Sequence, residues 1–373
     1  MKNKINIIQF TPYFPPHKWW LETVAEEIWE YWVVKNLGVF INITLSVGQE
    51  NLASEYGKDG YRVFVIPAFD IVPNFPIPKI WDKNFWSTLK KIKDIIWDKK
   101  EDFRVMTHTR FFLSSFIWWI FAIKNKVSWI HLEHGSGYVK LSSKFKSKVA
   151  YLYDRLIWKW IFKSANKILV ISKACEKFIH KEFVEREVEV FYRGLDFPEA
   201  LREKKGDIRI VFVWRLVWLK WVNHLIEAYK KYEIQNDLII IWDGEEKKSL
   251  EIHAEENRNI SFLWFKNRDF VLDYLKKNNC LFINPSYQEG MPTTVMEALF
   301  YGNVSIATDV WGTREISDKG DLIIIQPWNE DEIWKSIENA LDEYKDLAWK
   351  SRNTINERFS RDSNIKKLYE LIK

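Results

Sequence analysis

The chain has 373 residues, of which 47% are hydrophobic and 29% are charged, a composition typical of a soluble globular protein and not of a disordered or fibrous one. At this length we expect two domains of ordinary size. The 56 basic and 51 acidic side chains give a formal net charge of +5, which is too small to indicate a nucleic-acid partner. Two cysteines, Cys175 and Cys280, form no disulfide framework and favour a reducing, cytoplasmic compartment.

Apolar segments of strand length alternate with amphipathic segments of helix length along the first half of the chain, the pattern of parallel α/β architecture. Residues 5–10 begin it as a strand and 21–37 follow as a helix. The apolar residues 111–123 are too few to span a membrane and are expected to form a buried helix. The further strands expected here are 41–46, 63–66, 103–106, 129–132 and 167–171.

The same alternation restarts after a charged segment near residues 198–207, which indicates a linker. The expected strands are 209–213, 238–241, 260–263, 280–284, 304–307 and 322–325, and the expected helices are 221–232, 245–256, 270–278, 293–301 and 331–344. We therefore predict an α/β protein of two Rossmann-like domains, 1–197 and 207–358, whose parallel sheets face a central cleft. A C-terminal helix, 359–373, could pack back on the first domain.

The most informative segment is 284–299, where a buried strand, a turn and a helix follow one another. Glu289 precedes the turn at Gly290, and Glu297 lies about one turn into a helix that begins near Thr293. Carboxylates accept paired hydrogen bonds from the vicinal hydroxyls of a sugar or ribose, and a helix start offers N–H groups to a phosphate. The alternative is that Glu297 is a solvated helix residue.

Two cations, Arg215 and Lys220, follow the strand 209–213. A guanidinium and an ammonium group can stabilise the charge of a departing diphosphate, although either side chain alone could be a solvated loop residue. The chain has no Asp-x-Asp motif, so we expect catalysis without a metal or other cofactor. His131 and His134 have a His-x-x-His spacing, but a strand-to-loop passage gives them no shared face and no third ligand is evident.

The glycine and tryptophan counts are unusual. There are 13 glycines, where about 26 would be ordinary, and 21 tryptophans. Several tryptophans stand at corners between strands, loops and helices, where a positive φ favours glycine. One hypothesis is that the organism reads UGA as glycine at these positions; the alternative is a protein truly rich in tryptophan. The positions concerned are Trp19, Trp20, Trp214, Trp242 and Trp311.

In this order, the motifs resemble those of the retaining glycosyltransferases of family 4, which have the GT-B fold. The resemblance covers nearly the whole chain. Its matched segments are residues 11–22, similar to the family's glycine-rich loop; 193–196, similar to Asn-Gly-Ile-Asp with arginine for asparagine; 214–221, similar to Gly-Arg…Lys-Gly; 241–244, similar to Gly-x-Gly; and 289–297, similar to the paired-glutamate motif.

The resemblance implies a role for each matched residue. Arg215 and Lys220 would bind the donor diphosphate, Glu297 the ribose and Glu289 the transferred sugar. His134 aligns with a histidine near the reacting centre, although a lone histidine is often structural. Backbone N–H groups beside the sugar would come from the segment of Gly290, Met291, Pro292 and Thr293.

We therefore expect a hexosyltransferase that uses a UDP- or GDP-sugar and a hydroxyl acceptor, a sugar or a lipid-linked sugar, in polysaccharide, cell-envelope or glycolipid synthesis. The resemblance implies retention by front-face displacement. Two alternatives stay open: a nucleotide-sugar epimerase of the same fold, and a catalytically inactive nucleotide-sugar-binding protein, which literal tryptophans in the site would favour.

A basic segment, 140–163, has seven Lys or Arg residues and a single acid, with apolar residues between them. Such an amphipathic helix could lie at the cytoplasmic surface of an anionic membrane. The alternative is a solvated face that covers the domain core.

Overall fold

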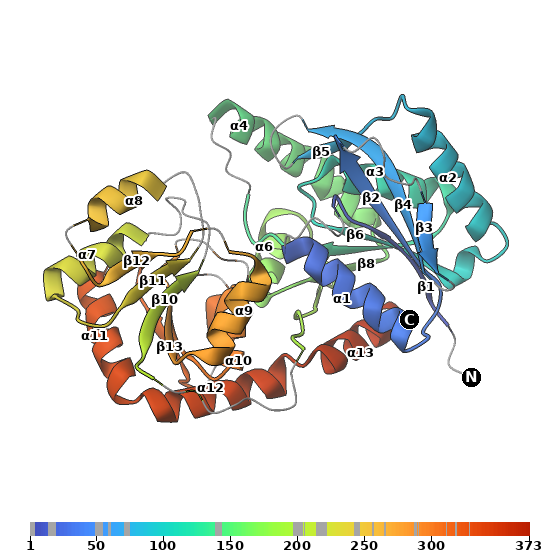
Figure 1. The fold of residues 1–373 in the computed structure, drawn as a ribbon. Coiled ribbons are helices and arrows are strands. Elements are labelled where there is room, and N and C mark those ends of the chain that lie inside the picture. The colour runs from blue at the N-terminus through green and yellow to red at the C-terminus, as the bar shows by residue number, and fades with distance from the viewer. Residues whose placement is uncertain are drawn as a thin grey trace. The chain divides into compact units, whose positions relative to one another are not determined.

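The computed structural model divides the chain into two compact units, Met1–Arg193 with Asp362–Lys373, and Gly194–Arg361 (Figure 1). Each unit has one β-sheet covered by helices and a hydrophobic core of its own. The residues described are 4–13, 20–48, 55–58, 61–70, 75–138, 144–196, 204, 206–213, 222–241, 247–255, 257–264, 266–286, 289, 291–310, 312–317, 319–327 and 329–373.

The sheet of the first unit has the strand order β3-β4-β2-β1-β6-β7-β8-β9, with β5 paired to β4. The interior pairs are parallel, as predicted, but β3 and β5 are antiparallel to β4. Only two residues separate β3 from β4, which is too short for a parallel crossover. The strands are β1 (Asn6–Phe10), β2 (Phe40–Val47), β3 (Glu55–Lys58), β4 (Tyr61–Asp70), β5 (Pro76–Pro78), β6 (Phe103–His108), β7 (Ser128–Glu133), β8 (Lys167–Val170) and β9 (Glu189–Val190).

The helices of this unit cover both faces of its sheet. Trp20, expected in a loop, is instead the first residue of α1, and the buried helix predicted at 111–123 is α3, which packs Trp118 and Ala122 into the core. The helices are α1 (Trp20–Val34), α2 (Lys83–Ile96), α3 (Leu113–Asn125), α4 (Lys144–Tyr153), α5 (Lys159–Ser164), α6 (Lys173–Glu182) and α13 (Arg361–Ile372), with a π-helical turn at Asp154–Trp158 and a 3₁₀ turn at Lys100–Asp102.

The second unit has a fully parallel sheet of order β12-β11-β10-β13-β14-β15. Its central strands are buried on both faces, which explains their continuous apolar sequences. The strands are β10 (Arg209–Val213), β11 (Leu238–Ile241), β12 (Ile260–Phe262), β13 (Cys280–Asn284), β14 (Val304–Thr308) and β15 (Leu322–Ile325). The helices are α7 (Val222–Tyr232), α8 (Lys247–Ala254), α9 (Arg268–Lys277), α10 (Thr293–Phe300), α11 (Glu330–Asp342) and α12 (Tyr344–Arg358), with a 3₁₀ turn at Thr313–Glu315.

The chain passes between the units after Arg193 and again after Arg361, and the backbone segments near these two points are hydrogen-bonded to each other. The N–H of Leu195 donates to the carbonyl of Phe359 at 2.7 Å, and the N–H of Arg361 donates to the carbonyl of Leu195 at 3.0 Å. A Cβ at Gly194 would lie 2.3 Å from the Cα of Arg361, so that glycine is required where these two segments pack.

The last helix, α13, belongs to the core of the first unit. The ring of Tyr369 lies 5.5 Å from the ring of Trp32 on α1, and the carbonyl of Ile372 accepts a hydrogen bond from Arg104 at 3.3 Å.

Candidate active site

Two buried glutamates lie beyond the carboxyl end of β13, the edge of a parallel sheet at which ligands commonly bind. Glu289 lies between β13 and α10 and is 6% exposed, and Glu297 is one turn into α10 and 5% exposed. The burial of Glu297 contradicts the alternative that it is a solvated helix residue. The structure thus keeps both carboxylates inside the protein, where an unpaired charge would be costly.

Each carboxylate is held by a side chain that was not predicted from the sequence. Asn284, the last residue of β13, donates from Nδ2 to Oε1 of Glu289 at 3.2 Å. Arg268, the first residue of α9, places Nη2 and Nε at 2.7 and 3.1 Å from Oε1 of Glu297. Both guanidinium nitrogens contact the same carboxylate oxygen. This contact holds Glu297 in place and does not involve its second oxygen, as a bidentate pair would.

The start of α10 lies between the two glutamates in the sequence. Pro292 is the N-cap, and its carbonyl accepts the N–H groups of Val295 and Met296 at 3.1 and 3.2 Å. The N–H groups of Thr293 and Thr294 precede the first hydrogen bond of the helix, and the helix dipole favours an anion beside them. The adjacent Met291 is buried. Three predicted site residues, Arg215, Lys220 and Gly290, lie outside the described residues.

His134 lies in the first unit, directly after β7, as predicted. It is 5% exposed, and its Nε2 is 3.1 Å from Nδ1 of His108, the last residue of β6. The two imidazole rings stack with their centroids 5.3 Å apart. Burial lowers the pKa of His134 to about 3, although the charge of Glu133 acts in the opposite direction.

A fully buried carboxylate, Glu133, fixes the backbone around His134. It accepts the N–H groups of His134 and Gly135 at 3.0 and 2.7 Å and lies 3.0 Å from the guanidinium of Arg110. Burial alone would raise the pKa of Glu133, but the Arg110 charge and the hydrogen bonds hold it far below its usual value.

Arg110 connects this loop to the π-helical turn. It donates to Asp154 at 3.1 Å and to the carbonyl of Gly137 at 2.5 Å. Burial raises the pKa of Asp154 to about 6, while Arg110 partly offsets this increase. A π-turn often marks a functional site. Arg110 and Asp154 were not identified from the sequence, because a single arginine and a single aspartate 44 positions apart give no local pattern.

The backbone next to His108 is strained. Thr109 has a φ of +49°, a left-handed conformation that is rare for a β-branched residue. Its N–H donates to the carbonyl of Leu132 at 2.9 Å, and its hydroxyl donates to Glu133 at 3.2 Å. Such strain persists where neighbouring contacts impose it, and it is concentrated at functional sites.

Both ring nitrogens of His131 are bound to protein groups. Nδ1 lies 2.9 Å from the hydroxyl of Thr107, and Nε2 lies 3.3 Å from Glu133. Within the described ranges, no group of three His, Cys, Asp or Glu side chains could hold a metal ion. Across the same ranges, none of the helices has the length and apolar character needed to cross a membrane.

The comparisons with known proteins agree on one class of enzyme. Residues 196–359 match the family model described as glycosyl transferases group 1. The chain is 31% identical to an uncharacterised glycosyltransferase of Methanocaldococcus jannaschii, over 97% of both chains. It is 26% identical to the UDP-Gal:α-D-GlcNAc-diphosphoundecaprenol α-1,3-galactosyltransferase of Escherichia coli, over 50% of this chain and 52% of that protein.

Among solved structures, the chain is similar to Anabaena HepE in complex with UDP. The TM-score is 0.70 at 14% sequence identity, and the match covers 99% of both chains. This similarity shows the fold, and the chain has the GT-B fold of two Rossmann-like units, as predicted.

Proposed function

Because the chain belongs to the family of glycosyl transferases group 1 and is a glycosyltransferase, we propose that it transfers a hexose from a UDP- or GDP-sugar to a hydroxyl acceptor with retention. The observation that carries this proposal is the pair of buried glutamates beside the start of α10. Glu297, fixed by Arg268 through one oxygen, can use its other oxygen for the ribose hydroxyls of the donor. Glu289 then contacts the transferred sugar.

The diphosphate carries the charge that develops when the sugar leaves. In the proposed mechanism, the N–H groups of Thr293 and Thr294 and the cations Arg215 and Lys220 stabilise this charge, so that no metal ion is required. The acceptor hydroxyl attacks the anomeric carbon from the face that the diphosphate leaves. As the new C–O bond forms and the old one breaks, the hydroxyl proton passes to the leaving phosphate oxygen.

The relatives support a uridine nucleotide and a lipid-linked acceptor. HepE is similar in fold and was solved with UDP, and the E. coli relative uses UDP-Gal and a diphosphoundecaprenol-linked sugar. We therefore propose a UDP-sugar as the first donor to test and a diphospho-polyprenol-linked sugar as the first acceptor.

The test incubates the protein with a panel of UDP- and GDP-sugars and acceptors, measures the free nucleoside diphosphate, and determines the product anomer by NMR. We expect one donor to give an α-linked product, and Glu289→Gln to lower kcat about 10²–10³-fold. Glu338→Gln, an exposed glutamate on α11, is the matched control. A change in the sugar without an acceptor would instead support the epimerase, and donor binding without turnover would support the inactive homologue.

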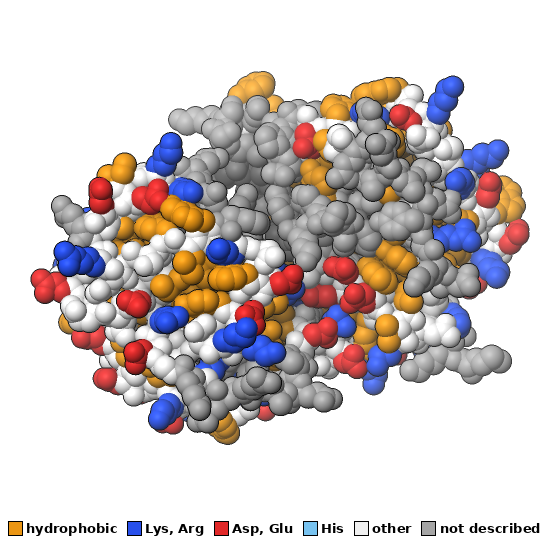
Figure 2. Space-filling model, in the orientation of Figure 1, with side chains coloured by type: hydrophobic (Ala, Val, Ile, Leu, Met, Phe, Trp, Pro, Cys, Tyr) orange, Lys and Arg blue, Asp and Glu red, His pale blue; other side chains and the backbone are white. Residues whose placement is uncertain are grey.

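We also propose that the first unit binds an anionic membrane surface. The basic segment folds as α4, the π-turn and α5, and its large apolar side chains recur every three or four residues, which places them on one face. This face is exposed: Phe145 is 75% and Leu156 is 72% exposed, and Figure 2 shows hydrophobic side chains over α4. The exposed apolar residues of the face are Phe145, Val149, Leu152, Leu156 and Trp160.

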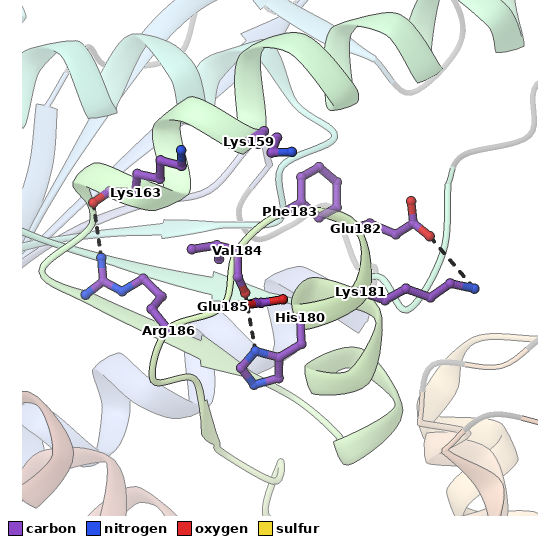
Figure 3. Close-up of a pocket in the computed structure, with 9 residues that line it drawn as sticks. All are labelled: Lys159, Lys163, His180, Lys181, Glu182, Phe183, Val184, Glu185 and Arg186. Carbon is purple, nitrogen blue, oxygen red and sulfur yellow. Dashed lines mark hydrogen bonds and ion pairs between the residues drawn. The ribbon is translucent and has the colours of Figure 1, made fainter.

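Basic groups lie beside this apolar face. Lys148 on α4 and Lys159 and Lys163 on α5 are exposed. Lys159 and Lys163 also line a cavity of about 620 Å³ between α5 and α6, together with Lys181 and Arg186 (Figure 3). Exposed apolar residues flanked by lysines are what an interfacial helix needs to enter anionic lipid.

Sedimentation with phosphatidylglycerol vesicles tests this surface. We expect binding that weakens with salt and with Leu156→Glu, while Ile252→Glu, at a residue 71% exposed in the second unit, leaves it unchanged. Equal binding of Leu156→Glu and the unaltered protein would contradict the assignment.

Finally, we propose that some tryptophans stand where the living protein has glycine. Trp32 and Trp129 are fully buried, as native tryptophans often are. The indole N–H of Trp32 donates to the carbonyl of Ile5 at 2.8 Å, and that of Trp129 donates to the hydroxyl of Thr107 at 3.0 Å.

Trp19, Trp214, Trp242 and Trp311 lie outside the described residues. We expect UGG codons at the two buried positions and UGA at 214 and 242. UGG at 19, 20, 214 and 242 would refute the proposal, and the donor assays should include Trp214→Gly and Trp242→Gly.

A further inference from the structure

Three buried polar side chains form a hydrogen-bonded chain across neighbouring strands of the first unit. Oε1 of Gln9 on β1 lies 3.1 Å from Nε2 of His108 on β6, and Nδ1 of His108 lies 3.1 Å from Nε2 of His134, which follows β7. The strands β1, β6 and β7 are adjacent in the sheet. Gln9 and His108 are each 0% exposed, so that protein groups alone decide which atoms carry the protons.

The orientation of the Gln9 amide is fixed at the far end of this chain. Its Nε2 donates to the carbonyl of Ala25 at 3.1 Å and to Oδ1 of Asn42 at 3.2 Å. A backbone carbonyl can only accept a hydrogen bond, so the amide nitrogen must face Ala25. The oxygen of the Gln9 amide therefore faces His108, and it too can only accept.

The protons on both histidines follow from this orientation. Nε2 of His108 must carry the hydrogen that Gln9 accepts. Burial lowers the pKa of His108 well below its usual value, so the ring is neutral and its Nδ1 has a lone pair. Nε2 of His134 must then carry the hydrogen that His108 accepts. Because His134 is neutral as well, with a pKa of about 3, its Nδ1 has a lone pair.

We propose that Gln9 and His108 are positioning residues that lock His134 in the tautomer with hydrogen on Nε2, and that His134 thereby takes part in the transfer reaction as a neutral ring with an unprotonated Nδ1. The second clause rests on the proposed glycosyltransferase reaction; the tautomer itself does not. In this state His134 does not act as a cation toward the diphosphate.

Burial keeps the two rings neutral, and the charged groups near them are themselves paired. His108 faces the rings of His131 and His134. His134 faces the carboxylate of Glu133, the ring of His131 and the guanidinium of Arg193. Arg193 is paired with Glu27 at 2.7 Å, and Glu133 is paired with Arg110 at 3.0 Å. Each of these charges therefore has an opposite charge beside it.

Long-range ¹H–¹⁵N NMR correlation on the full chain labelled with ¹⁵N-histidine reads the tautomer without requiring activity. The His134 signals are identified from the spectrum of His134→Asn. We expect Nε2 of His134 to be protonated and Nδ1 to be unprotonated from neutral pH down to about pH 5. A protonated Nδ1 or a mixture of tautomers in the unaltered protein would overturn the proposal, whatever the enzyme transfers.

Two variants at His108 separate the tautomer from the packing. In His108→Asn, the side-chain oxygen can replace Nδ1 as the acceptor, so the His134 tautomer should persist; in His108→Leu, which has no acceptor, the tautomers should mix. Gln9→Met, which does not touch His134, should also mix them. With an active donor–acceptor pair, we expect His108→Leu and Gln9→Met to lose about tenfold in kcat and His108→Asn to retain most of it. Equal loss in all three variants, with one unchanged tautomer, would show that these residues serve only packing.

Discussion

The two units hold their candidate functional side chains in different ways. In the first unit, His134 depends on a network in which Glu133 is 0% and Arg110 is 2% exposed. In the second unit, Glu297 is held by Arg268, whose side chain is 39% exposed. The first arrangement is built into the core and is complete before any ligand binds. The second lies at the edge of the sheet, where a ligand can share the same groups. Substitutions in the first unit should therefore cost stability, and those in the second should cost ligand affinity.

The largest expected effect is that of Arg110→Met. It removes the guanidinium and leaves Glu133 charged and buried without its 3.0 Å partner. Breaking a buried pair in this way lowers the free energy of unfolding by about 3–5 kcal/mol. Urea-induced unfolding of the full chain would measure this loss. Arg155→Met, which removes an exposed partner of Glu182, should leave the unfolding free energy nearly unchanged. Similar small losses for both variants would remove the distinction between the units.

A smaller effect is expected from Arg268→Met. The loss of two hydrogen bonds to Glu297 should free this carboxylate and weaken the binding of UDP about tenfold, or about 1.4 kcal/mol. It should lower the free energy of unfolding by less than Arg110→Met does, because the Arg268 side chain is 39% exposed. Isothermal titration calorimetry gives the Kd. Lys277→Met, which removes an exposed ion pair on the same helix α9, is the control. If Arg268→Met destabilised the second unit and left the Kd unchanged, Arg268 would be structural.

The smallest effect concerns pH. Since the pKa of His134 is about 3 in the folded chain and 6.5 as a free side chain, the unfolded chain binds the proton first as the pH falls. Protonation of His134 in the unfolded chain therefore lowers the free energy of unfolding by about 0.8 kcal/mol as the pH falls from about 7.5 to 6. His134→Asn should reduce that loss. His180→Asn, at a ring 38% exposed on α6, is the control variant. An unchanged pH dependence in His134→Asn would contradict the neutral state on which the tautomer argument also depends.

The sequence predicted most strands of both sheets, because strands buried on two faces are continuous apolar runs. β11, β13 and β15 begin and end where they were expected. The short edge strands β3 and β5 and the polar helix α12 were not predicted, since their positions depend on pairing or packing and not on local periodicity. The sequence also predicted that Glu289 and His134 follow a strand and that Glu297 lies in the helix after Glu289, and the structure has them there; their roles in the site stay predictions.

The partners of those residues came only from the tertiary structure. Arg268 reaches Glu297 from 29 positions away, and Gln9 reaches His108 from 99, distances over which no periodicity connects two side chains. By itself, the sequence determined the class of enzyme and named candidate site residues, because strand patterns and local motifs are properties of short segments. The folded sheets decided which charge neutralises which and which nitrogen of His134 carries its proton, because these depend on atoms that only parallel strands bring together.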